Sequence, residues 1–238
     1  VDLYKDEEVH RLFVVNAADP SILIYDVGER GQLDLIQTLK DPRLTTPNSV
    51  VAVGPRSFYV SNASQGSGRG LLAELSFLLG NASGSILYYD GSSLSNAASE
   101  LKYANGIEIS ADGSQLYVAE TSGKAMTIYD RNLRFGVIVP SGRLLLDGFP
   151  DNINRLDDGA LLVSSIPAPR AFAKHRTDAE RLAPSRILKL EMPIDLASVP
   201  EAVFQDDGNA LSGATSAIRL GQNLLIGAYA ENKFLLCN

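Results

Sequence analysis

A two-strand template recurs four times along the chain and limits the possible fold more than any other feature. Each copy starts with small polar residues and an apolar alternation, turns at a glycine, and returns as a second apolar strand. The copies are NSVVAVGPRSFYVSN (48–62), NGIEISADGSQLYVAE (105–120), DNINRLDDGALLVSS (151–165) and TSAIRLGQNLLIGA (215–228). Alternation with period two around a glycine turn predicts a β-hairpin.

Further apolar segments extend these hairpins. We expect third strands at 21–27, 84–91, 124–131 and 185–192, and weaker fourth strands at 33–39, 133–140 and 201–206. A spacing of roughly 45 to 65 residues between hairpins fits four-stranded propeller blades with variable loops. We therefore predict an all-β chain that forms a single β-propeller domain over residues 1–238. Residues 12–40 would be a blade without its first strand, and residues 215–238 a blade without its last.

Two segments interrupt the strand pattern. GLLAELSFLLGN (70–81) has apolar residues at helical spacing and predicts a short surface helix, whereas 167–185 is charged, flanked by proline and typical of a long loop or frayed helix. GSGRG (66–70) lacks the Gly-Lys-Ser/Thr that completes a phosphate-binding loop, which favours a flexible loop.

Composition excludes several classes of function. The net charge of −7 argues against nucleic acid as a partner, and no apolar run is long enough to predict a membrane span. The only cysteine is Cys237, and the two histidines, His10 and His175, lie in charged runs typical of the surface. So few cysteines and histidines argue against a zinc site. The sequence does not indicate the oligomeric state.

Oxygen-bearing residues occupy matching places in the template, where the first strand of a hairpin begins and the second ends. The expected pairs are Asn48 with Asn62, Asn105 with Glu120, Asp151 and Asn152 with Ser165, and Thr215 and Ser216 with Ala228. If the first strand of each blade is the innermost, these positions lie around one axis. Ca²⁺ takes six to eight oxygen ligands from such mixed sets. The alternative is that each Asn or Asp only caps its own turn.

The four blocks, in this order and approximate spacing, resemble the serum paraoxonase/arylesterase family, within the wider gluconolactonase/regucalcin-like propellers. The resemblance runs from Leu12 to the C-terminus and is carried most specifically by the VAVGP block and the LLIG ending. It implies a six-bladed propeller that hydrolyses lactones and aryl esters with Ca²⁺ in its tunnel. About four to five blades would be represented here, with an N-terminal part lacking.

The resemblance also implies roles for particular residues. Asn62, Asn105, Asp151 and Asn152 match the family's catalytic calcium ligands, and Asn48 matches a stretch that lines the same tunnel. Cys237 matches a cysteine that pairs with one near the family's N-terminus. Secretion is a further implication, as is a small-molecule ester or lactone as the partner.

Departures from the family concern the second metal and the general base. Ala63 stands where the family has an Asp of a structural calcium site, and Ala17 stands where it has one histidine of a dyad. The other histidine, and the remaining Glu and Asp ligands, belong to a region upstream of Val1. Asp151 and Glu120 are then the candidate bases, although Glu120 could equally be a solvated charge at a strand end.

Three hypotheses about function follow. The first is a calcium-dependent hydrolase of lactones or aryl esters. The second is a non-catalytic propeller that binds or scaffolds a partner and keeps a degenerate site. The third is a sugar-lactone hydrolase of gluconolactonase type, with the same fold and metal but smaller, polar substrates.

Overall fold

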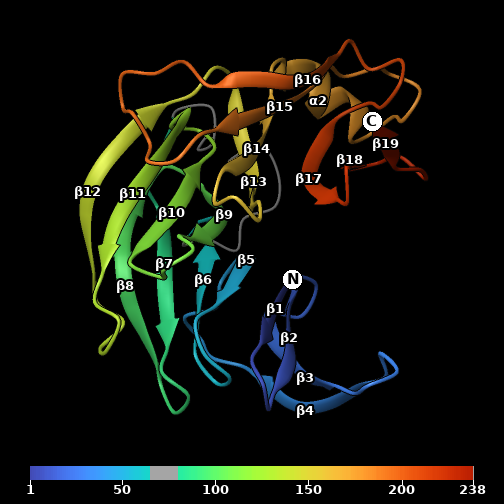
Figure 1. Cartoon of the computed structure of the whole chain (residues 1–238). Helices are drawn as coiled ribbons and strands as arrows, with labels where there is room; N and C mark the ends of the chain where they lie inside the picture. The colour runs from blue at the N-terminus through green and yellow to red at the C-terminus, as the bar shows by residue number, and fades with distance from the viewer. Residues whose placement is uncertain (65–79, 238) are drawn as a thin grey trace. The chain divides into compact units, whose positions relative to one another are not determined.

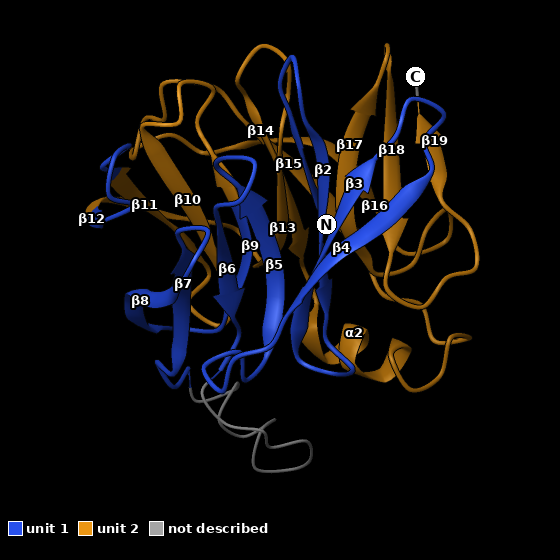
Figure 2. Cartoon of the chain, turned by 90° about the horizontal axis from the view of Figure 1, so that it is seen from below, with its two compact units in different colours: residues 1–107, 131–139 blue, residues 108–130, 140–238 orange. Residues whose placement is uncertain are grey.

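The computed structural model describes residues 1–64 and 80–237, which form five sheets and one short helix (Figure 1). In each sheet, strands that follow one another in the sequence are hydrogen-bonded neighbours. The 66–70 segment lies outside the described residues, and so does the helix expected over 70–81, except for its last two positions. The chain divides into two compact units, residues 1–107 with 131–139 and residues 108–130 with 140–238 (Figure 2).

The first two sheets belong to the first unit. One consists of β1 (Asp2–Lys5), β2 (His10–Asn16), β3 (Ser21–Val27) and β4 (Leu33–Leu39). The other consists of β5 (Pro47–Ala52), β6 (Phe58–Asn62), β7 (Gly84–Tyr89) and β8 (Leu94–Leu101). The third sheet consists of β9 (Ala104–Ile109), β10 (Gln115–Glu120), β11 (Ala125–Arg131) and β12 (Ile138–Leu145).

The last two sheets belong to the second unit. The fourth consists of β13 (Phe149–Arg155), β14 (Leu161–Ile166), β15 (Ser185–Leu190) and β16 (Glu201–Asp206). The fifth consists of β17 (Ala214–Leu220), β18 (Asn223–Ala228) and β19 (Leu235–Cys237). Helix α2 (Pro169–His175) connects β14 to β15. All four predicted hairpins are confirmed, and the fifth sheet has three strands, as expected.

Four predictions about the strands need correction. The first sheet does not lack its first strand, because β1 pairs with β2 and the charged run that follows Tyr4 forms the turn between them. The outer strand expected at 133–140 begins only at Ile138. The polar strand β8 was not predicted, because its sequence LSNAASEL lacks apolar alternation. The described residues form five sheets, not the six that the resemblance implies for the family.

Apolar side chains from neighbouring sheets form the cores within each unit. In the first unit, the Phe58 ring lies between Phe13 and Tyr89, with ring centroids 5.4 and 5.2 Å away. In the second unit, β14 is buried on both sides: Leu161 and Val163 belong to one cluster, and Leu162 to another. Successive side chains of a strand point to opposite faces, which is why LLV serves two cores.

The first strand of three hairpins carries an extra residue close to the candidate polar side chains. The pairing shifts between Pro47 and Val50, between Pro150 and Ile153, and between Ala214 and Ser216. The partners of Asn62 and Ser165 are therefore Pro47 and Pro150, not the Asn and Asp residues that alternation predicts. A bulge bends its strand and re-aims side chains, and bulges are frequent next to functional sites.

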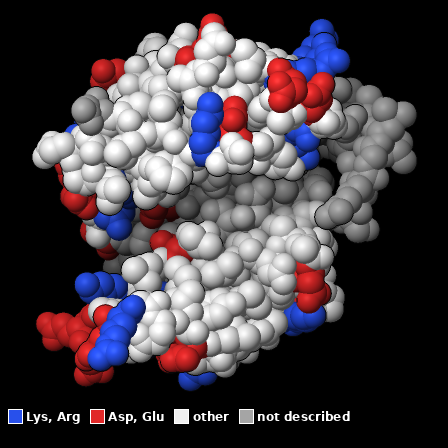
Figure 3. Space-filling model, turned by 90° about the vertical axis from the view of Figure 1, so that its right-hand side faces the viewer, with Lys and Arg blue, Asp and Glu red and all other residues white. Residues whose placement is uncertain are grey.

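Charged side chains on the face drawn in Figure 3 occur in small groups of both signs, separated by uncharged surface. No helix formed by residues 1–64 or 80–237 has the length and apolar character needed to cross a membrane.

Candidate functional site

Asn62 is the most completely enclosed of the predicted ligands. It ends β6 and is 1% exposed. Its Nδ2 donates to the carbonyl of Arg43 at 2.7 Å, while its Oδ1 accepts only a long bond, 3.4 Å from the Thr46 nitrogen. Because the nitrogen side of the carboxamide is held by a backbone carbonyl, the direction of Oδ1 is fixed. Such support from outside the ligand shell is typical of metal-binding side chains.

The carbonyl that holds Asn62 belongs to a residue that is itself fixed. Arg43 donates from Nε and Nη2 to the Asp41 carboxylate, at 2.7 and 2.6 Å, and from Nη1 to the Leu94 carbonyl. The Asp41 carboxylate also accepts from the Arg43 backbone nitrogen at 2.9 Å. The Arg43 guanidinium lowers the pKa of the Asp41 carboxyl to about 2.

Ser61 links the second sheet to the first strand of the third. Its hydroxyl donates to the Asn105 carbonyl at 2.6 Å and accepts from the Ser49 nitrogen in the bulge at 3.0 Å. Asn105 is 5% exposed and lies on β9, next to this link. Asn48, in the same bulge as Ser49, is exposed. Within the first unit, Asn62 therefore ends β6, and Asn105 lies near the start of β9.

Asp151 and Asn152 occupy the bulge of β13 in the second unit, and both are half-buried. Asn152 Nδ2 donates to the Thr215 carbonyl on β17 at 2.8 Å and lies 3.4 Å from Asp151 Oδ1. The amide of Asn152 is thus fixed in the same manner as that of Asn62, by a backbone carbonyl of a neighbouring segment. The two carboxamides nevertheless occupy different positions of their repeats, because Asn62 ends a second strand and Asn152 lies in the bulge of a first strand.

Glu120 differs from the solvated strand-end charge that one interpretation of the sequence predicted. The residue is 5% exposed. Its Oε1 accepts from the Thr127 hydroxyl at 2.5 Å and lies 3.4 Å from Arg143 Nε. Thr127, in the adjacent strand β11, supplies the hydrogen bond that makes burial of the Glu120 carboxylate possible. The alternation of the sequence did not identify Thr127 as this partner.

The two histidines have different environments. His10 is exposed at the start of β2, as predicted. The prediction for His175 is wrong: it is 0% exposed at the end of α2, and its Nδ1 is 2.9 Å from the Arg181 carbonyl. Charged neighbours suggested a surface position, but Lys174 and Arg176 lie on other sides of the helix turn. Cys237, on β19, is partly buried beside the core of the fifth sheet.

Sequence reasoning also missed the small residues at the second-to-last position of the four sequence templates. This position holds Ser61, Ala119, Ser164 and Gly227. At Gly227, an added Cβ would lie 2.8 Å from Ser216 Oγ, so a larger residue would have to displace this hydroxyl of the bulge. The repeated small residue is visible in the four templates, three of which carry a bulge in the first strand.

The predicted donors fit a hard cation. They are carboxamide and carboxylate oxygens, the ligands that Ca²⁺ prefers, and the two asparagines with recorded amide contacts are held through nitrogen. Four of the five predicted donors are asparagines, and across residues 1–64 and 80–237 no three His, Cys, Asp or Glu side chains cluster at metal-binding range.

A family model described as Arylesterase matches residues 2–238. The chain belongs to the arylesterase family. Serum paraoxonase/arylesterase 1 of Mus musculus is 29% identical over 233 residues, which cover 95% of this chain and 64% of the relative. Mechanosensory abnormality protein 6 of Caenorhabditis elegans is 26% identical, with coverage of 96% and 62%. This arylesterase-family chain therefore spans less than two thirds of the length of these relatives.

Solved structures show the fold of this arylesterase-family chain to be a β-propeller. A calcium-binding protein, regucalcin, from Agrobacterium tumefaciens aligns with a TM-score of 0.59 at 13% identity, covering 97% of this chain and 68% of that one. The periplasmic gluconolactonase of Pseudomonas aeruginosa aligns with a TM-score of 0.58 at 12% identity, covering 99% and 64%. At these identities the likeness concerns the fold, and the five sheets correspond to blades.

Proposed function

We propose that the chain is part of a calcium-dependent hydrolase of lactones or aryl esters, with Asn62, Asn105, Asp151 and Asn152 as calcium ligands and Asn48 beside them. Membership of the arylesterase family supports the ester hydrolase class. The observation that carries the metal proposal is the shared restraint of two asparagines. Asn62 and Asn152 each donate Nδ2 to a backbone carbonyl, which turns Oδ1 toward another direction.

The chemistry requires an electrophilic carbonyl and a base. Bound calcium would polarise the ester carbonyl and stabilise the oxyanion. The role of the asparagines is to present neutral oxygens, so that one or two carboxylates leave the cation with residual positive charge. Asp151 is the candidate that would accept a proton from the attacking water. Glu120 is the less suitable base, because its Oε1 already accepts from the Thr127 hydroxyl.

Turnover with and without chelator tests the proposal. Hydrolysis of phenyl acetate and of an aliphatic lactone is measured in calcium and in EDTA, for the wild type, Asn105→Ala and Asp151→Ala. We expect EDTA and both substitutions to abolish turnover, with His10→Ala as the unaffected control. Activity that survives EDTA, or survives the loss of Asp151, contradicts the proposed site.

A non-catalytic binding propeller is the second candidate, and the histidines favour it. His10 lies at the far end of β2 from Asn16, and His175 is enclosed. Calcium binding with no turnover of any ester would support this candidate. A higher rate on gluconolactone than on acyl lactones would instead support the sugar-lactone hydrolase. The word serum in the names of several relatives supports export from the cell as a further proposal.

A further inference from the structure

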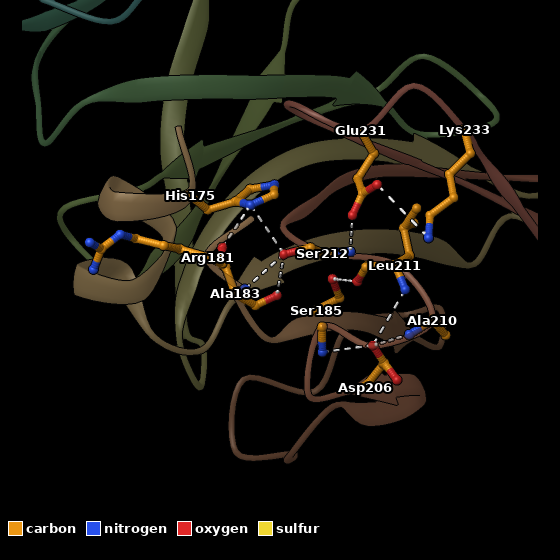
Figure 4. A network of polar contacts seen from close by, with 11 residues as sticks. His175, Arg181, Ala183, Ser185, Asp206, Ala210, Leu211, Ser212, Glu231 and Lys233 are labelled. Carbon is orange, nitrogen blue, oxygen red and sulfur yellow. Dashed lines mark hydrogen bonds and ion pairs between the residues drawn. The ribbon is translucent and has the colours of Figure 1, made fainter. Parts of the chain in front are cut away.

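A buried network of hydrogen bonds joins the end of α2 to the segment that precedes β17 (Figure 4). His175 Nδ1 lies 2.9 Å from the Arg181 carbonyl and 3.3 Å from Ser212 Oγ. A carbonyl oxygen can only accept, so Nδ1 carries the proton and shares it between the two oxygens. The ring therefore fixes both the loop after the helix and the hydroxyl of Ser212.

The segment around Ser212 is held from three sides. Ser212 Oγ accepts from the Ala183 nitrogen at 2.7 Å, and the Ser212 nitrogen donates to Glu231 at 3.2 Å. Gly213 donates to the Ala183 carbonyl at 3.0 Å, and Ala214 donates to the Ser185 hydroxyl at 2.9 Å. This backbone has no freedom to shift unless several buried hydrogen bonds break together.

The His175 ring packs directly against this backbone. Gly213 has a φ of +65°, and a Cβ added there would lie 3.0 Å from His175 Cδ2 and 3.1 Å from the Phe172 ring. The His175 ring can lie this close to the backbone because residue 213 has no side chain. His175 thus acts on the segment through hydrogen bonds and through contact.

Thr215 follows two residues after Gly213, and its carbonyl accepts the 2.8 Å bond from Asn152 Nδ2. We infer that His175 is a positioning residue for Asn152. It acts through Ser212 and Gly213 on the Thr215 carbonyl, and so on the direction in which Asn152 presents Oδ1. The inference rests on the proposed function, because it assigns to α2 and its loop the support of one calcium ligand.

Only the Nδ1 side of the His175 ring takes part in the hydrogen-bond network. Nε2 is buried and has no hydrogen-bond partner among the described residues, so Nδ1 makes every polar contact of the ring. The Nδ2 group of an asparagine reaches a similar place to Nδ1 of a histidine. His175→Asn should therefore keep the network, whereas His175→Leu fills the space without donating a hydrogen bond.

Two readouts test the inference in the full chain. The first is calcium affinity by titration calorimetry for the wild type, His175→Leu, His175→Asn, Ser212→Ala and the exposed control His10→Leu. We expect His175→Leu and Ser212→Ala to weaken calcium binding about tenfold. This is the lower end of the affinity losses found when residues that support metal ligands are replaced. His175→Asn and His10→Leu should bind as the wild type does.

The second readout needs no calcium. The side-chain NH₂ signals of Asn152, assigned by their loss in Asn152→Ser, should exchange slowly with solvent in the wild type and in His175→Asn. They should exchange faster in His175→Leu and Ser212→Ala. Unchanged exchange in both of these folded variants would overturn the inference. A wild type that binds no calcium refutes the proposed function instead, and the exchange measurement still decides the role of His175.

Discussion

Two serines at the same position of different repeats give a matched test of what a buried hydroxyl contributes. Ser61 and Ser164 are 0% and 1% exposed. Ser61 Oγ bonds the Asn105 carbonyl and the Ser49 nitrogen, whereas Ser164 Oγ has no partner in the described part of the chain. We expect Ser61→Ala to lower the free energy of unfolding by about 1–3 kcal/mol, because buried partners are left unsatisfied.

Ser164→Ala should leave the free energy of unfolding unchanged or raise it, since it removes a buried polar atom that gains nothing there. Urea unfolding of the two variants and the wild type gives the comparison. Equal losses at both positions would show that packing, rather than the hydroxyl, accounts for the effect of Ser61→Ala.

Asp41 should make the free energy of unfolding depend on pH in the acidic range. Its pKa is lowered to about 2 by hydrogen bonding to Arg43. A lowered folded-state pKa stabilises the protein above the unfolded pKa, and this stabilisation disappears as the pH falls from about 4 to about 2. Asp41→Asn should therefore melt below the wild type at pH 6, and the gap should close toward pH 2.

The size of this gap is limited by solvent. Because the Arg43 side chain is 50% exposed, the pair should contribute less than about 1 kcal/mol. For a chain of this length, that corresponds to at most about 2–4 °C in melting temperature. Melting curves at several pH values measure it, and a gap that widens as the pH falls would reverse the sign argued here.

At the scale of elements, the docking of α2 predicts different costs for two glycines with the same backbone conformation. Gly213 and Gly221 have φ of +65° and +62°, but only Gly213 has side chains within contact distance of an added Cβ. We expect Gly221→Ala to cost about 1–2 kcal/mol from backbone strain alone. Gly213→Ala should cost about 1–3 kcal/mol more, because the methyl overlaps His175 and Phe172. Equal costs in chemical denaturation would show that the helix yields without penalty.

Apolar strand patterns around glycine turns predicted the hairpins and all four expected third strands, because the faces of these strands are buried, as in β14. They failed at β1, where the run after Tyr4 is charged, and at β8, where polar residues occupy an outer strand. Outer strands are held mainly by backbone hydrogen bonds to one neighbour, so their sequences carry little periodic signal.

The candidate site was predictable as a set of residue types but not as a set of contacts. The template placed Asn62 and Asp151 at strand ends; the structure has Asn62 at the end of β6, whereas Asp151 lies inside β13, in its bulge. It could not show that a bulge pairs Asn62 with Pro47, since one inserted residue leaves the composition of the strand unchanged. Nor could it predict the burial of His175, which depends on the segment that connects β16 to β17.

At the scale of the whole molecule, calcium should raise the melting temperature if the proposed ligands bind it. A ligand that binds only the folded state, at 100 times its dissociation constant, adds about 2.7 kcal/mol to the free energy of unfolding. For a chain of this size, we expect a rise of about 5–10 °C in melting temperature. Magnesium at the same concentration should raise it less, because Mg²⁺ requires a smaller and more regular shell.

Variants of the proposed ligands make this test specific. Asn62→Ala and Asp151→Ala should each abolish the calcium shift if both residues serve the same ion. His10→Ala, an exposed substitution, should retain the full shift. If one of these two variants keeps the calcium shift while the other loses it, the residue that was replaced in the variant with the shift is not a ligand. The donor set would then have to be reassigned around the residue whose replacement abolishes the shift.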